Sequence, residues 1–203
     1  MIESLINYKV ATSSTLPPLS ALMKEYWLAG NGVFVRAKRQ ELYGCIPIAQ
    51  CHIPGLAAID PNVQMEYPRV PASIVSTRLS AAQAVGKKEI LFYLSNINGN
   101  WQLDIPEQVA KRASVTPRLA SLGSAYETAL IEVHSHHEMN AQFSPRDDLE
   151  ESGKFRIFVV MGEIFSRPTI NVRLGIYSHF WQIPAAWVLK MPIQLSDSFE
   201  LCN

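Results

Sequence analysis

The chain has 203 residues, of which 48% are hydrophobic and 18% are charged. This composition is typical of a folded globular protein and excludes a disordered chain, and the length suits one domain with a sizeable core. Lys and Arg together number 18, as do Asp and Glu, so the formal net charge is zero. A neutral chain gives no electrostatic reason to expect nucleic acid or an anionic membrane as a partner.

The compartment is predicted from what the sequence lacks and from its cysteines. The N-terminal stretch carries charged residues and no apolar core of the kind found in a secretory signal. No run of about 18 apolar residues occurs, so no segment is predicted to span a membrane. Cys45, Cys51 and Cys202 do not follow a metal-knuckle spacing and are predicted to be free thiols in a reducing compartment. The expected location is the cytoplasm.

The first third of the chain is predicted to begin with a strand-like or irregular leader over residues 1–16. Pro17 and Pro18 open an apolar-periodic stretch that ends at Gly30, which predicts a helix between these points. Two strands are predicted to follow, at residues 33–35 and 42–49. Pro47 indicates that the second strand lies at an edge or contains a bulge.

The middle of the chain is predicted to alternate between loop, helix and hairpin. Residues 52–71 are rich in proline and lack periodicity, which indicates a long loop, and the alanine-rich residues 73–85 favour a helix. Asn98-Gly99 lies between two apolar runs, which predicts a hairpin over residues 90–105. A helix start at Asp104 then predicts a short helix that ends near residue 113.

The last third is predicted to hold three strands, at residues 128–133, 155–161 and 169–177. Helices and strands are therefore mixed along the chain, and the expected class is α/β or α+β.

Three of the five histidines fall within four positions at the end of the first of these strands. Residues two apart on a strand project from the same face, so His134 and His136 are expected to lie side by side. Two imidazoles in this arrangement can share one metal ion.

A carboxylate downstream completes a candidate metal site. Ser144 fits a helix N-cap, Pro145 fits the first helical position, and Asp147 follows in the first turn. Asp147 would then face the two histidines from the start of the helix. Three protein ligands leave the fourth tetrahedral position for water, which is the pattern of a catalytic zinc site.

Each part of this pattern is common by itself, because histidine pairs and helix starts of this kind also occur without any metal. The combination of His, His, Ser and Asp at these fixed offsets is expected in roughly one chain in a thousand or fewer. The combined spacing therefore favours a metal site over separate structural roles.

The spacing His134-Ser135-His136, then Ser144 and Asp147, resembles the JAMM signature H-[S/T]-H-x7-S-x2-D of the MPN-domain metalloproteases. The resemblance implies a single MPN-like (cytidine-deaminase-like) domain over residues 1–203, with a mixed sheet flanked by helices. The loop at 52–71 and the hairpin at 90–105 would be insertions. It also implies that the two histidines and Asp147 bind zinc and that Ser144 stabilises the tetrahedral intermediate.

The family also uses an upstream glutamate that acts on the attacking water. Glu41, followed by Gly44, fits the family pattern and is the first choice, although 93 positions separate it from His134 (134 minus 41), a longer span than is usual. Glu89 is the alternative. Glu132 shares the strand face of the histidines and is expected to support the ligands from behind.

The residue after the second histidine is usually proline in this family, whereas here it is His137. It is predicted to be a solvent-facing loop residue, and a role near the metal stays open.

The implied substrate is an isopeptide or peptide bond at the C-terminus of a ubiquitin-like or sulfur-carrier-like protein. The extended middle of the chain is also similar to the MPN-type proteins of plasmid-borne PRTRC gene clusters, which implies a ThiF-like partner. The alternative function is a non-catalytic MPN-type scaffold that binds protein partners.

Overall fold

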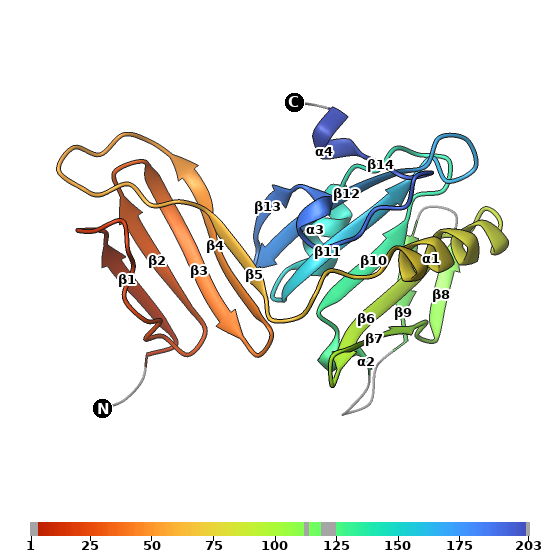
Figure 1. The fold of residues 1–203 in the computed structure, drawn as a ribbon, viewed down its shortest axis with the longest axis horizontal. Helices are drawn as coiled ribbons and strands as arrows, with labels where there is room; N and C mark the ends of the chain where they lie inside the picture. Colours follow the sequence, from red (N-terminus) through yellow and green to blue (C-terminus); the bar gives the residue numbers. More distant parts are fainter. Residues whose placement is uncertain (1–3, 112–113, 119–124, 202–203) are drawn as a thin grey trace. The chain divides into compact units, whose positions relative to one another are not determined.

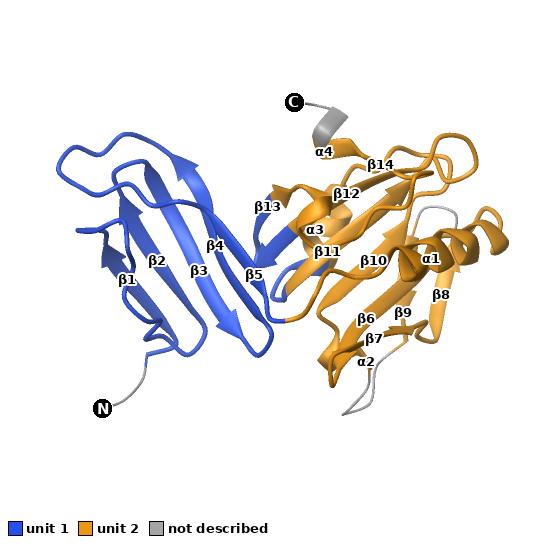
Figure 2. Cartoon of the chain, viewed as in Figure 1, with its two compact units in different colours: residues 1–66, 151–155, 174–181 blue, residues 67–150, 156–173, 182–203 orange. Residues whose placement is uncertain are grey.

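The structure is a computed structural model that describes residues 4–111, 114–118 and 125–201. It is an α+β protein with mixed sheets and few helices, in agreement with the predicted general class. The chain divides into two compact units (Figure 2). The first holds residues 1–66, 151–155 and 174–181, and the second holds residues 67–150, 156–173 and 182–203.

A five-stranded sheet forms most of the first unit (Figure 1). Its strands lie in the order of the sequence: β1 (Ile6–Val10), β2 (Lys24–Ala29), β3 (Gly32–Arg39), β4 (Leu42–Gln50) and β5 (Asn62–Met65). β1 pairs with β2 in parallel, and the other neighbours are antiparallel. The apolar core of this unit includes Trp27, Phe34 and Ile59.

The helix predicted between Pro17 and Gly30 is wrong. The second half of this stretch, Lys24–Ala29, is strand β2. Glu25, Trp27 and Ala29 alternate into the interior, while Leu28 is exposed. Pairing with a strand on each side stabilises this extended conformation, and it overrides a local apolar pattern that also fits a helix.

A larger mixed sheet has the strand order β13-β12-β11-β10-β6-β7, with β14 paired to β12 (Figure 1). The strands are β6 (Leu91–Ile97), β7 (Asn100–Asp104), β10 (Ile131–Ser135), β11 (Phe155–Gly162), β12 (Thr169–Ile176), β13 (His179–Ile183) and β14 (Ser196–Asp197). β10 runs parallel to β11 and antiparallel to β6. The end of β10, where the histidines follow, therefore lies beside the end of β11 and the start of β6.

The remaining elements are short apart from the first helix. They are α1 (Ala72–Ala84), α2 (Ala125–Thr128), α3 (Pro145–Glu151), the 3-10 turn η1 (Ala185–Trp187), α4 (Ser198–Leu201) and the β8–β9 hairpin (Gln108–Lys111 and Ser114–Pro117). α1 buries one face through Val75, Arg78, Leu79 and Ala82, which recur at helical spacing. None of the helices in the described part of the chain has the length and apolar character needed to cross a membrane.

The predicted hairpin around Asn98-Gly99 is confirmed as β6 and β7. β6 also pairs with β10 and is almost entirely buried, so the hairpin is part of the main sheet. The short helix predicted to follow it is wrong, because Gln108–Lys111 is strand β8. Its pairing with β9 outweighs the local helix-start signal. Residues 112–113, at the predicted end of that helix, lie outside the described residues.

Candidate metal centre

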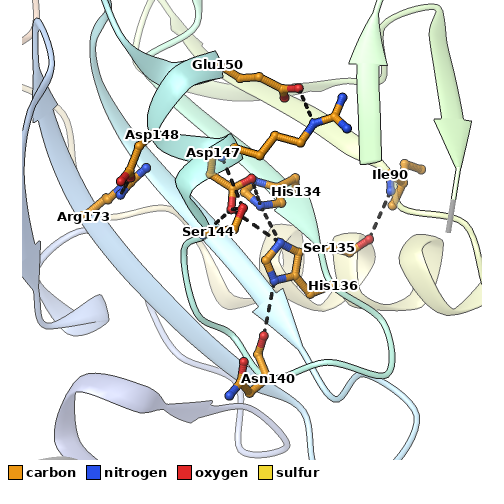
Figure 3. Close-up of polar contacts among 11 residues, drawn as sticks. Ile90, His134, Ser135, His136, Asn140, Ser144, Asp147, Asp148, Glu150 and Arg173 are labelled. Carbon is orange, nitrogen blue, oxygen red and sulfur yellow. Dashed lines mark hydrogen bonds and ion pairs between the residues drawn. The ribbon is translucent and has the colours of Figure 1, made fainter. Parts of the chain in front are cut away.

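The end of strand β10 places the side chains of His134 and His136 next to each other (Figure 3). His134 is in the strand, and His136 follows its last residue, where the His136 N–H donates to the carbonyl of Met161 on β11 at 2.7 Å. This bond continues the pairing of β10 with β11, so the extended alternation persists as far as His136. Both side chains are buried, and their ring centroids lie 4.8 Å apart.

Helix α3 supplies the carboxylate from its first turn. The Ser144 N–H and hydroxyl both donate to Asp147 Oδ2, at 2.6 and 2.7 Å, and the Asp147 N–H lies 3.3 Å from Ser144 Oγ. This reciprocal capping fixes the Asp147 side chain at the helix N-terminus, as the sequence pattern predicted. The other carboxylate oxygen, Oδ1, is directed to His134.

The donor atoms of the three side chains converge. His134 Nε2 lies 3.1 Å from His136 Nε2 and 3.3 Å from Asp147 Oδ1, and His136 Nε2 lies 3.7 Å from Asp147 Oδ2. Tetrahedral zinc bonds of about 2.0–2.1 Å separate neighbouring ligand atoms by roughly 3.3–3.4 Å. The two nitrogens lie near this spacing, and one ligand atom from each of the three residues lies within 4.8 Å of the other two, so the set could hold one zinc ion and leave a fourth position for a further ligand.

The ring of His136 is held in the orientation that a ligand needs. Its Nδ1 lies 3.3 Å from the carbonyl oxygen of Asn140, to which an N–H at that position donates. The lone pair of a neutral ring is then on Nε2, which faces His134 and Asp147. Burial, followed by the charge of His134, lowers the pKa of His136 and favours this neutral form.

Asp147 has the opposite electrostatic character. Burial opposes ionisation of this carboxyl, but the hydrogen bond and charge of His134 and the hydrogen bonds from Ser144 outweigh it, so its pKa lies well below the usual range. The site therefore presents two imidazoles and one carboxylate, which is a suitable donor set for a divalent cation.

Glu89 lies in the same unit, immediately before β6. Its side chain is 4% exposed. Burial raises the pKa of Glu89 to about 7, and the nearby charges of His134 and Asp147 lower and raise it, respectively. These interactions show that the Glu89 carboxyl is within electrostatic range of two of the three candidate ligands.

Glu41, the first choice from the sequence, lies in the turn between β3 and β4, with a φ of 77°. It belongs to the first unit, whereas the histidines and Asp147 belong to the second. Its neighbour in the pattern, Gly44, packs within that first unit, because a Cβ there would lie 2.4 Å from Leu174 Cδ2. Local packing thus accounts for the glycine of the Glu-x2-Gly pattern.

His137 is not the solvent-facing residue that the sequence predicted, since its side chain is 3% exposed. Glu132 is also buried and receives a hydrogen bond from Arg156 at 3.0 Å.

The supporting groups that sequence reasoning missed are Asn140, through its carbonyl, and Gly162, at the end of β11. The sequence shows Gly162 only as a glycine at the end of an apolar run. Glycine is required there because the backbone of residues 139–141, in another segment, approaches too closely for a Cβ.

Cys45 and Cys51 are not part of the candidate metal cluster. Cys45 is buried, which raises the pKa of its thiol to about 11, and Cys51 is exposed. Cys202 lies outside the described residues. In the described part of the chain, the cluster His134, His136 and Asp147 alone brings three potential ligands within 4.8 Å of one another.

No protein-family model matches this chain, and a search of curated proteins finds no match.

Proposed function

We propose that this protein is a zinc-dependent hydrolase that cleaves an amide bond. The observation that carries this proposal is the convergence of His134, His136 and Asp147, whose ligand atoms lie within 4.8 Å of one another. An open fourth position beside a carboxyl group distinguishes a catalytic arrangement from a closed structural site.

When bound by these residues, zinc would polarise the scissile carbonyl and make a water molecule more acidic. The protein's own groups orient the ligands. Asn140 fixes the ring of His136, and Ser144 fixes the carboxylate of Asp147. The Ser144 hydroxyl donates to Asp147 in this structure, so it must turn toward the substrate to stabilise an oxyanion.

We propose Glu89 as the general base in place of Glu41. Its burial, its raised pKa and its electrostatic coupling to His134 and Asp147 all suit a group that takes a proton near neutral pH. Only 45 positions separate it from His134 (134 minus 89), compared with 93 for Glu41. Glu89 would accept the proton of the attacking water and pass it to the leaving amine.

The JAMM-like spacing supports the narrower proposal of an MPN-like hydrolase. By that resemblance the substrate is an isopeptide or peptide bond at the C-terminus of a ubiquitin-like or sulfur-carrier-like protein, and a ThiF-like protein is a candidate partner. The substrate is proposed from the motif, and the partner from the similarity of the extended middle of the chain to the MPN-type proteins of PRTRC gene clusters.

Substitution of the two glutamates tests the chemistry. In zinc-loaded protein, Glu89→Gln preserves size and removes basicity, and should lower hydrolysis of a C-terminal fluorogenic amide of a ubiquitin-like protein by about 100- to 10,000-fold. Zinc content should not change. Glu41→Gln should hydrolyse the same probe at the rate of the unsubstituted protein.

The reverse pattern, with loss in Glu41→Gln alone, would show that the base is misassigned. If the zinc-loaded protein cleaves neither this probe nor unrelated peptide amides, the non-catalytic scaffold is the better account.

A further inference from the structure

The backbone at His137 adopts an unusual conformation directly after a candidate ligand. Its φ is 39°, in the left-handed region that residues other than glycine seldom adopt. Proline is fixed near −65°, so it does not fit this position. Strain of this kind persists only where surrounding contacts stabilise it.

The ring of His137 is buried and contacts Ser135 through one of its nitrogens. Its Nδ1 lies 3.3 Å from the hydroxyl oxygen of Ser135, and the ring packs beside Phe165 at a centroid distance of 5.9 Å. Among the described residues, its Nε2 has no hydrogen-bond partner. The polar neighbours of the ring are thus the Ser135 hydroxyl, at Nδ1, and the backbone of Ala82 on α1.

Ser135 also forms hydrogen bonds with Ile90, the residue before β6. The Ile90 N–H donates to Ser135 Oγ at 3.1 Å, and the Ser135 N–H donates to the Ile90 carbonyl at 3.2 Å. The hydroxyl has a single proton, and its oxygen already accepts from Ile90. Among the described residues, His137 Nδ1 is the acceptor that lies within reach of this proton, so the assigned direction is from the Ser135 hydroxyl to Nδ1, with the neutral ring protonated on Nε2.

Ile90 is the residue that follows Glu89. The Glu89 N–H donates to the carbonyl of Lys111 at 2.9 Å, and the next N–H is fixed by Ser135. The peptide groups on both sides of Glu89 are therefore anchored, one by β8 and the other by the hydroxyl that His137 orients. This arrangement restricts where the Glu89 carboxyl can lie.

We infer that His137 is a positioning residue for Glu89, acting through the Ser135 hydroxyl and the Ile90 amide. The inference rests on the proposed function, in which Glu89 is the general base. A base displaced by about 1 Å can lose as much as 100-fold in rate, so a hydrogen bond remote from the substrate has a measurable effect.

The first test needs neither zinc nor turnover. Nitrogen-15 NMR of metal-free protein should show the His137 ring protonated on Nε2. Amide hydrogen exchange at Ile90 should be faster in His137→Gly, which tolerates the backbone conformation and removes the ring. His137→Asn also tolerates it and retains an acceptor at the δ position, so it should restore protection.

The second test uses zinc-loaded protein and the fluorogenic amide. His137→Gly should lower kcat by about 10- to 100-fold while KM and zinc content are unchanged, and His137→Asn should recover most of the rate. The double variant of Ser135→Ala with His137→Gly should lose no more than Ser135→Ala alone, because both act through one hydroxyl.

A His137 ring protonated on Nδ1, unchanged exchange at Ile90, or losses that multiply in the double variant would overturn the inference while leaving the hydrolase proposal intact. Full hydrolysis by Glu89→Gln would instead overturn the proposed function and, with it, the role assigned to His137.

Discussion

Glu25 shows how a single carboxylate is stabilised inside the first unit. Its side chain is fully buried, and it accepts from Arg36 Nε at 2.6 Å and from Trp27 Nε1 at 3.0 Å, with Lys9 Nζ at 2.9 Å. Burial raises its pKa, but the Ser20 N–H, Lys9 and Arg36 outweigh it and lower the pKa from 4.5 to about 2. The charged form is therefore the one that the fold stabilises.

This shift predicts a pH-dependent contribution to stability. Because the folded pKa is depressed, the contribution is complete above the unfolded value of 4.5 and is lost as the pH falls toward about 2. A shift of this size corresponds to about 3 kcal/mol. Glu25→Gln should lower the free energy of unfolding by about that amount at pH 7 and by much less at pH 3, as measured by urea denaturation.

The exposed Glu66 provides the matched control, and Glu66→Gln should have little effect at either pH. An equal loss of stability at pH 7 and pH 3 for Glu25→Gln would mean that packing, and not charge, explains the role of Glu25.

At this scale the sequence predicts the proximity of the three candidate ligands. His134, His136 and Asp147 lie within 14 consecutive residues, so a strand end and a helix start suffice to bring them together. The place of Glu89 beside this strand depends on the antiparallel pairing of β6 with β10, whereas the choice of Glu41 follows from a local glutamate-glycine pattern. His137 was misjudged because nothing local reveals its burial.

At the scale of the elements, the end of β11 determines the shape of the turn that follows the histidines. A Cβ at Gly162 would lie 2.3 Å from the Ala141 nitrogen and 2.6 Å from the Met139 carbonyl oxygen. These are backbone atoms that cannot rotate away. The same turn carries the Asn140 carbonyl that faces His136 Nδ1.

Gly162→Ala should therefore displace the turn and weaken zinc binding. Loss of a group that orients a ligand typically lowers metal affinity by about 10- to 100-fold. A competition titration with a chromophoric chelator would measure this change, and circular dichroism would confirm that the variant is folded. Gly86→Ala is the control for backbone strain alone, because φ there is 71° but a Cβ meets nothing within 4 Å. Equal zinc affinity in the two variants would contradict this role for Gly162.

The elements that could be predicted are those with complete local signals. α1 has an alanine-rich stretch with an apolar face, and the β6–β7 hairpin has Asn98-Gly99 at its turn. β2 and β8 could not be predicted, because their extended form depends on partners elsewhere in the chain. Strand pairing, which is non-local, decided both cases.

At the scale of the whole molecule, the proposed chemistry is contained in one of the two units. The candidate ligands, Glu89 and the groups that orient them come from segments 89–90, 134–140 and 144–147, all in the second unit. The sequence indicated the α+β class but not this division, since composition and periodicity do not report which sheets share a core.

The zinc content of the purified protein is the most direct test of the metal centre. The account predicts about one zinc per chain by elemental analysis of protein prepared without chelator. His136→Ala and Asp147→Ala should each remove most of the metal, whereas His52→Ala, at a histidine of the other unit, should retain it. Metal-free protein that takes up no added zinc, or variants that retain the full amount, would contradict the central claim.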